Sequence, residues 1–194
     1  MKVKCLLLVL LCPFLLSSYT DSEQVAYGPR SYSVIDSYWS QPPIVKVCKQ
    51  SRISDSRVRM AIEYWKRLGY QFESIIYDDE SISCTMFRPS YGEIIITIPD
   101  QNFDFKNIAM TRTVIHSSSK EILYSIIYIQ DNKASKERVL EHEFGHAFGW
   151  SHSPRSYHIM NKAWENGGHS SVGLEFDRYQ ELIQEIISEG LTPN

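Results

Sequence analysis

The residues best suited to chemistry lie in one run of eleven, His142-Glu143-Phe144-Gly145-His146-Ala147-Phe148-Gly149-Trp150-Ser151-His152. Residues four apart lie on the same face of an α-helix, so His142 and His146 can both point at one metal ion. Glu143 lies beside them, where its carboxylate can take a proton from a metal-activated water without binding the metal. The spacing therefore predicts a catalytic zinc site with a general base.

His152 can join this site only if the helix ends before it. A third ligand six residues beyond His146 cannot reach the same ion while the helix continues. Gly149 lets the backbone turn, because glycine adopts the left-handed helix-ending conformation at little steric cost. Three histidines leave a fourth position open for water, as a catalytic zinc site requires. His-Glu-x-x-His alone also occurs by chance on amphipathic helices, but the eleven-residue form is more specific.

This motif resembles the signature of the metzincin superfamily of zinc endopeptidases, His-Glu-x-x-His-x-x-Gly-x-x-His, and matches it without a gap. The resemblance implies one catalytic Zn²⁺ per chain, held by His142, His146 and His152, with Glu143 as general base and then general acid. It also implies a methionine in a tight turn beneath the zinc (the Met-turn), for which Met160 is the candidate. The alternative for Met160 is an ordinary core methionine.

Ser153 follows the third histidine and makes this segment most similar to the matrixins, the matrix-metalloproteinase group. The sequence departs from that family elsewhere. It has no cysteine-switch segment of the Pro-Arg-Cys-Gly type, and no loop rich in Gly and Asp like the one that holds structural zinc and calcium in vertebrate matrixins. Asn161 and Lys162 stand where astacins carry tyrosine after the methionine. The resemblance is therefore specific around the zinc.

The elements that must position the motif follow from hydrophobic periodicity and turn signals. Strands are predicted at 44–47, 72–77, 93–98, 109–115 and 122–130, and helices at 55–68 and 175–188. Ser135 is predicted to cap the helix of the motif, whose buried face would hold Val139, Leu140, Phe144, Ala147 and Phe148.

The metzincin resemblance arranges these elements as an α+β fold. It implies a twisted, mostly parallel five-stranded sheet with an antiparallel edge strand, an active-site helix, a Met-turn and a C-terminal helix. Strand 109–115 is the expected edge, where a polypeptide substrate would bind in extended form by adding a strand; the alternative is a merely exposed edge. The loop 164–173 is expected to wall the pocket beside the cleft. We expect His158 to be a surface or supporting residue rather than a fourth ligand, and His116 to be solvated.

The N-terminal sequence predicts the localisation of the protein. Lys2 and Lys4 precede an apolar stretch at 5–16, which indicates a signal peptide at 1–18 and a secreted protein, extracellular or periplasmic. A retained interfacial anchor and a lipid-modified Cys12 are the alternatives. We then expect an extended lead-in or short pro-segment at 19–43 and the catalytic domain at 44–194.

Removal of that leader would leave Cys48 and Cys84 as the remaining cysteines. In an oxidising compartment the two predict a disulfide that closes a loop of about 35 residues and adds about 3 to 4 kcal/mol to stability. The alternative is that Cys48 caps the zinc in a latent form.

Composition limits the remaining function classes. The chain has 194 residues, is 43% hydrophobic and 22% charged, and carries a net charge of −3. These values suit one compact domain and give no basic footprint for nucleic acid. No segment after the leader predicts a membrane span, and we expect a monomer. Asp78-Asp79-Glu80 is an acidic turn that lacks the spaced oxygens of a calcium site, so Ca²⁺ remains an unsupported alternative.

The sequence thus predicts a secreted zinc-dependent metalloendopeptidase that hydrolyses peptide bonds through a zinc-activated water. One alternative is a non-catalytic secreted zinc-binding or interaction protein, against which the presence of Glu143 argues. Another keeps the chemistry but acts on peptide bonds in a cell wall.

Overall fold

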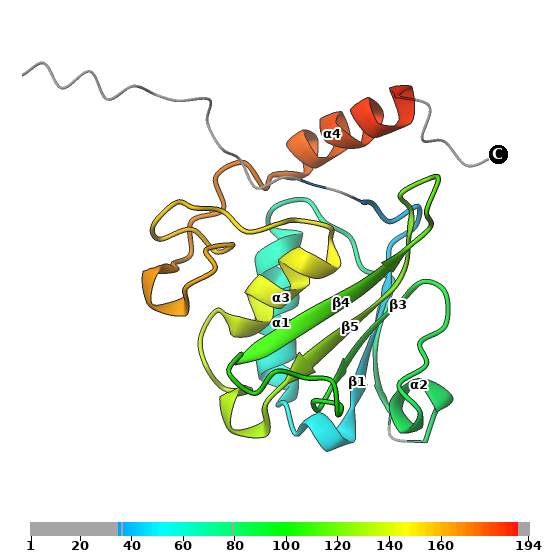
Figure 1. Ribbon diagram of the computed structural model, residues 1–194, viewed down its shortest axis with the longest axis vertical. Coiled ribbons are helices and arrows are strands. Elements are labelled where there is room, and N and C mark those ends of the chain that lie inside the picture. Colours follow the sequence, from blue (N-terminus) through cyan, green and yellow to red (C-terminus); the bar gives the residue numbers. More distant parts are fainter. Residues whose placement is uncertain (1–34, 36, 79, 190–194) are drawn as a thin grey trace, which may run out of the picture. The chain divides into compact units, whose positions relative to one another are not determined.

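A five-stranded sheet forms the centre of the structure, a computed structural model that describes residue 35, residues 37–78 and residues 80–189. The predicted signal peptide at 1–18 lies outside the described residues. The strand order is β2-β1-β3-β5-β4 (Figure 1). The strands are β1 (Ile44–Cys48), β2 (Ser74–Asp78), β3 (Glu93–Thr97), β4 (Ala109–Ile115) and β5 (Ile122–Ile129).

The strand directions confirm the predicted fold class. β1 pairs in parallel with β2 and β3, β3 pairs in parallel with β5, and β4 alone of these runs antiparallel, against β5. The antiparallel strand is also an edge of the sheet, as expected for 109–115. The β4–β5 hairpin turns through the polar residues 116–120, which leaves His116 exposed and away from the site.

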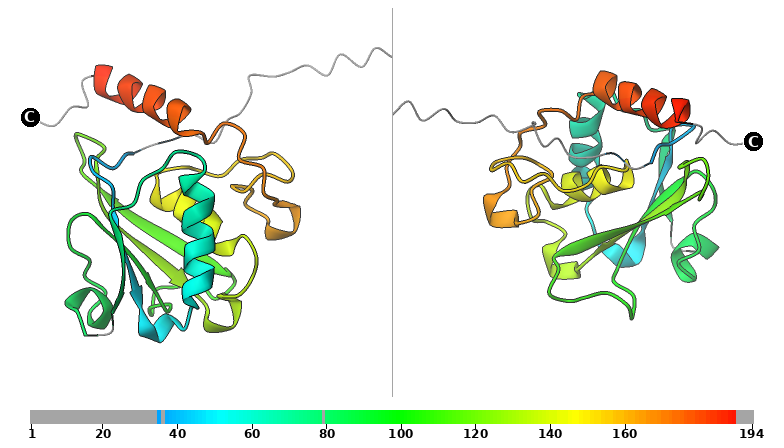
Figure 2. Two further views of the ribbon diagram at one scale, coloured as in Figure 1. Left: turned by 180° about the vertical axis from the view of Figure 1, so that it is seen from behind. Right: turned by 45° about the horizontal axis from the view of Figure 1, so that its top comes forward.

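The described residues form the helices α1 (Asp55–Lys66), α2 (Ile82–Thr85), α3 (Val139–Ala147) and α4 (Phe176–Ser188). Of these, α1 and α3 are far apart in the sequence but pack together on one face of the sheet. α3 packs on β4 and β5 and also contacts α1 (Figure 2). Ser54 caps α1 by accepting a bond from the Arg57 backbone N–H.

Both faces of the central strand β3 are buried, and this explains its run of isoleucines. Ile94 and Ile96 belong to the main core, which β3 shares with Trp65 of α1 and Phe144 of α3. Ile95 points to the opposite face and packs in a smaller cluster with Phe103, Ile126 and Tyr128. A parallel strand buried on both faces needs such a continuous apolar sequence.

A buried ion pair joins α1 to α3. Arg57 donates two hydrogen bonds to the Glu141 carboxylate, one of them from Nη1 to Oε1 at 2.7 Å, and both side chains are buried. The Trp65 indole N–H donates to the Glu141 carbonyl oxygen at 2.9 Å. Loss of one partner would leave an uncompensated buried charge, at a cost of about 3 to 5 kcal/mol. The pair therefore fixes the position of α3 at Glu141, the residue before His142.

The predicted cap of α3 is wrong. The chain makes a 3₁₀ turn at Asp131–Lys133, Ser135 is exposed, and the helix begins at Val139 after Arg138, which has a left-handed φ of 67° and makes no side-chain cap bond. Successive turn bonds from Lys133 to Gln130 and from Lys136 to Lys133 hold the chain out of the helix beyond Ser135. The predicted buried residues of this helix are confirmed, since Val139, Leu140, Phe144, Ala147 and Phe148 are all buried.

The structure contains the predicted disulfide between Cys48 and Cys84, with a Cα–Cα distance of 5.4 Å. Both cysteines are fully buried, and the bond ties the end of β1 to α2. Cys48 is therefore not available as a cap for a metal at His142.

Ile35 and residues 37–39, the N-terminal strap, pack against the end of α3. Ile35 forms an antiparallel bridge with Trp150. The Trp39 indole N–H donates to the Ala147 carbonyl oxygen at 2.7 Å, and the Trp39 backbone N–H donates to the Tyr179 hydroxyl at 3.1 Å. This described end of the predicted lead-in is thus extended and attached to the helix of the motif.

Gly149 ends α3 where the strap crosses it. Its φ is +90°, which confirms the predicted left-handed turn. A Cβ at this position would lie 2.5 Å from the Ser37 carbonyl oxygen. Both the backbone conformation and the close approach of the strap therefore require glycine.

We expect Gly149→Ala to destabilise the protein more than Gly92→Ala does. Gly92 also has a left-handed φ, +84°, but a Cβ there would meet no atom within 4 Å, so its substitution should cost only the conformational term of about 1 to 2 kcal/mol. Gly149→Ala adds the clash with Ser37. Urea unfolding of both variants measures the difference, and equal losses would show that the strap does not restrict this turn.

Candidate active site

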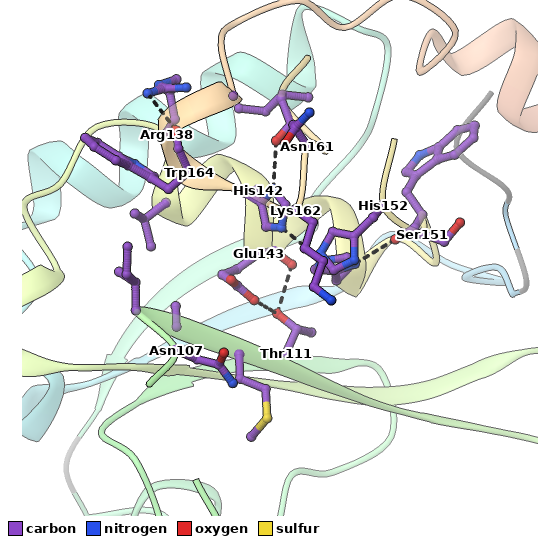
Figure 3. A pocket seen from close by; sticks show the side chains of 18 of the residues that line it. Asn107, Thr111, Arg138, His142, Glu143, Ser151, His152, Asn161, Lys162 and Trp164 are labelled. Carbon is purple, nitrogen blue, oxygen red and sulfur yellow. Dashed lines mark hydrogen bonds between the residues drawn. The ribbon is translucent and has the colours of Figure 1, made fainter. Parts of the chain in front are cut away.

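Three histidine side chains converge at the end of α3. His142 and His146 lie one turn apart on the helix. His152, which Figure 3 labels together with His142, returns to them after the Gly149 turn. The Nε2 atom of His146 lies 3.1 Å from Nε2 of His142 and 3.2 Å from Nε2 of His152. Their potential ligand atoms all lie within 4.8 Å of one another. No other such cluster is found among the residues that the structure describes.

The distances fit a tetrahedral zinc site. Zinc–nitrogen bonds of about 2.0 to 2.1 Å at tetrahedral angles place the nitrogens about 3.3 to 3.4 Å apart. The spacings of 3.1 and 3.2 Å between the Nε2 atoms are close to this value. The cluster can therefore hold a zinc ion with little movement of its side chains.

Backbone carbonyls set the protonation of the two helical histidines. Nδ1 of His142 lies 2.7 Å from the Ile159 oxygen, and Nδ1 of His146 lies 2.7 Å from the Trp150 oxygen. A carbonyl oxygen only accepts hydrogen bonds, so each Nδ1 must carry the proton and each Nε2 must present a lone pair. Lone pairs that face one another repel, and a cation between them removes the repulsion.

The surroundings also keep these imidazoles neutral. Burial, followed by the neighbouring histidines, lowers the pKa of His142 to about 4 and that of His146 to about 3. Burial and the charge of Lys162 lower the pKa of His152. Neutral imidazole is the form that binds metal, because a protonated ring nitrogen has no lone pair to give.

Glu143 lies beside the cluster on α3 and is almost completely buried. Burial raises the pKa of its carboxyl group to about 7, and a hydrogen bond from Thr111 opposes this rise. The Thr111 hydroxyl lies 2.7 Å from Oε2 and 3.1 Å from the backbone oxygen of the same glutamate. A cation held by the three histidines would favour the ionised carboxylate further.

Met160 lies in a turn that packs against α3. It is fully buried, and its carbonyl oxygen accepts a bond from the Ser153 N–H at 2.7 Å. A Cβ at Gly145 would overlap its sulfur atom, so the helix and the turn are in close contact. His158, only 1% exposed, accepts a bond from the Met160 N–H at Nδ1. His158 therefore supports this turn and is not among the converging histidines.

A cleft of about 740 Å³ runs along the site. β4 lines one side, with Ala109, Thr111 and Thr113, and residues 161–165 line the other. Trp164 and Gly167 are cleft-lining members of the loop predicted at 164–173.

Contacts to the segment before α3 hold Trp164 in place. The Trp164 indole N–H donates to the Glu137 carbonyl oxygen at 3.1 Å. Lys136 Nζ lies 4.2 Å from the centre of the indole ring. The wall of the cleft is thus attached to the chain that leads into α3.

Several groups that contact the converging side chains are not predictable from the sequence. Thr111 was part of a predicted strand, but its contact with Glu143 joins residues 32 apart in the chain. The Trp150 and Ile159 carbonyl groups carry no side-chain signal at all. Only the alternation of Thr111 and Thr113, which places both on one face of β4, could have indicated that this face meets a polar surface.

Comparison with known proteins identifies the family through one family model. Residues 46–186 match the family model of the matrixins. No curated protein matches the sequence. Among solved structures, the chain is similar to metalloproteinase-II from Bacteroides fragilis, with 14% identity and a TM-score of 0.44 over 80% of this chain and 59% of that one. This chain thus spans less than two thirds of that metalloproteinase. Because the family model covers most of the chain and includes the whole histidine motif, the chain belongs to the matrixin family.

Proposed function

We propose that this protein is a secreted zinc-dependent metalloendopeptidase. His142, His146 and His152 are the zinc ligands, Glu143 is the general base, and Met160 supports the ligands from below. The convergence of three neutral imidazoles on one point, with a carboxylate beside it, is the observation that carries this proposal. The donor set is the one that a catalytic zinc needs, because three protein ligands leave one position open.

The chain's own residues supply the proton transfers. A zinc ion bound here would supply Lewis-acid chemistry, polarising the scissile carbonyl group and lowering the pKa of a water. Glu143 takes the proton from that water and later gives it to the leaving amine. Thr111 holds the carboxylate in place by donating to Oε2, which leaves Oε1 free to accept the proton.

The edge strand supports binding of an extended polypeptide. β4 pairs with β5 on one side and is the last strand of the sheet on the other. Its backbone N–H and C=O groups on that side can pair with a substrate backbone of any sequence. Because β4 also lines the cleft, a peptide added to it passes directly by Glu143.

Two features support secretion. The disulfide between Cys48 and Cys84 suits an oxidising compartment. The predicted leader at 1–18 would direct the chain there.

In the part of the chain that the structure describes, no helix has the length and apolar character for a membrane crossing. All proposed ligands come from one chain, so a monomer is sufficient for activity.

The non-catalytic alternative is less well supported than the enzyme. A binding protein needs the three histidines but has no use for a buried carboxylate beside them, held by a threonine from another element. Calcium gains no support either, since Asp78 accepts bonds from the Glu80 and Ser81 backbone N–H groups.

We expect Glu143→Gln to lower kcat by about 10²- to 10⁴-fold, the usual contribution of a general base, while one zinc per chain is retained. Cleavage of a denatured protein and zinc analysis of the same samples test this. His152→Ala is the matched control that should lose zinc together with activity, and a chelator should abolish cleavage by the wild type. An active Glu143→Gln variant would rule out the proposed base.

We expect Thr111→Val to lower activity at neutral pH and to move the acid limb of the pH profile to higher pH. The hydroxyl stabilises the ionised carboxylate and so lowers the pKa of Glu143; without it that pKa rises, and the base is protonated at higher pH. Thr113→Val is the control, because Thr113 contacts Ser125 and the His146 carbonyl oxygen instead. Equal profiles for the two variants would contradict this role of Thr111.

A further inference from the structure

Lys162 is a cation at the cleft for which the described residues offer no counter-charge. It is exposed, lines the cleft, and follows Met160 by two residues; Figure 3 shows its side chain projecting into the pocket. Lys106 also lines the cleft, but Lys162 is the lysine whose charge lowers the pKa of His152. No carboxylate within the described part of the chain lies within ion-pair distance of its ammonium group.

The backbone around Lys162 is held rigidly. The Asn161 side chain donates to the Arg155 carbonyl oxygen at 2.8 Å and accepts from the Ala163 N–H at 2.9 Å. The Asn161 N–H also donates to the His158 carbonyl oxygen. The lysine stem therefore starts from a fixed point on the wall opposite β4.

The position of Lys162 is electrostatically unfavourable once the proposed metal ion is bound. The proposed site would bring a divalent cation to His152, and a lysine beside it is repelled by that charge. The whole chain carries a net charge of −3, yet the cleft is lined by Lys106, Arg138 and Lys162 against only Glu143 and Glu165. The cleft of this acidic protein thus carries an excess of positive charge. This excess indicates that a ligand supplies the anion that pairs with Lys162.

We propose that Lys162 is a specificity-determining residue that binds a carboxylate of the peptide substrate close to the scissile bond. This inference rests on the proposed function, because it assigns the substrate class of the same cleft. Carboxylates are the ordinary anions of a polypeptide, and they occur as Asp or Glu side chains and at the C-terminus. The protein therefore favours acidic segments, or peptide ends, over neutral ones of the same shape.

Matched peptides test the assignment. Each pair differs only by Glu or Gln at one position within three residues of the scissile bond, and a further pair has a free or an amidated C-terminus. We expect the wild type to favour one acidic member by about fivefold in kcat/KM, as for one partly exposed ion pair. Lys162→Gln should reduce that ratio to about one, and Lys162→Glu should invert it.

Two other lysines provide the controls. Lys133→Gln removes the same charge outside the cleft and should leave the ratio unchanged. Lys106→Gln removes a cation elsewhere in the cleft and should change the ratio less than Lys162→Gln does. An acidic preference that survives in Lys162→Gln, that falls equally in Lys106→Gln, or that is absent from the wild type would overturn the proposal. The peptide pair with a free or an amidated C-terminus identifies whether a side chain or the C-terminus supplies the carboxylate.

Binding separates this inference from the proposed function. The same fluorescent peptides are titrated, by anisotropy, into zinc-loaded Glu143→Gln and into Glu143→Gln combined with Lys162→Gln. If the wild type cleaves no peptide, the proposed peptidase function fails. The Lys162 assignment is then decided by whether the Glu peptide binds more tightly than the Gln peptide only when Lys162 is present.

Discussion

The site depends on three imidazoles whose Nε2 atoms are held close together. The Nε2 atoms of His142 and His152 lie 3.1 and 3.2 Å from that of His146, and the bonds from Nδ1 to backbone carbonyls leave lone pairs facing inward on the two helical rings. Without a cation between them, the lone pairs of His142 and His146 repel each other. The fold must therefore supply the free energy that keeps the rings together, and it does so from the segments on either side of the motif.

Two turns after α3 do most of this positioning. The Trp150 carbonyl group, one residue beyond the Gly149 turn, orients His146, and the Ile159 carbonyl group, one residue before Met160, orients His142. Each turn is fixed by packing from elsewhere in the chain. The N-terminal strap crosses at Gly149, and Met160 lies against Gly145 so closely that no side chain fits between them. The helix is held in turn by the buried pair of Arg57 and Glu141.

The sequence predicted what is local and missed what is distant. The predicted bounds of the five strands and of α1 and α4 lie within about two residues of the observed ones. They do so because alternation and helical periodicity reflect burial directly. The start of α3 differs from the predicted one, because the chain forms a 3₁₀ turn at Asp131–Lys133 and Ser135 does not cap the helix. The strap's bond from Trp39 to Ala147 joins residues 108 apart, and no local pattern encodes such a contact.

Burial has opposite consequences for the two kinds of group at this site. It keeps the histidines neutral, which suits metal binding, but it also favours the protonated form of Glu143, which cannot act as a base. Solvent exposure would favour the ionised form of Glu143. It would also favour protonation of the histidines, because His142 and Glu143 are neighbours on one helix. A single hydroxyl from the edge strand meets both needs: Thr111 stabilises the carboxylate without admitting water to the histidines. The strand that would bind the substrate therefore also influences the protonation of Glu143, the proposed base. A change in the position of this strand would alter substrate binding and the proposed proton transfer together.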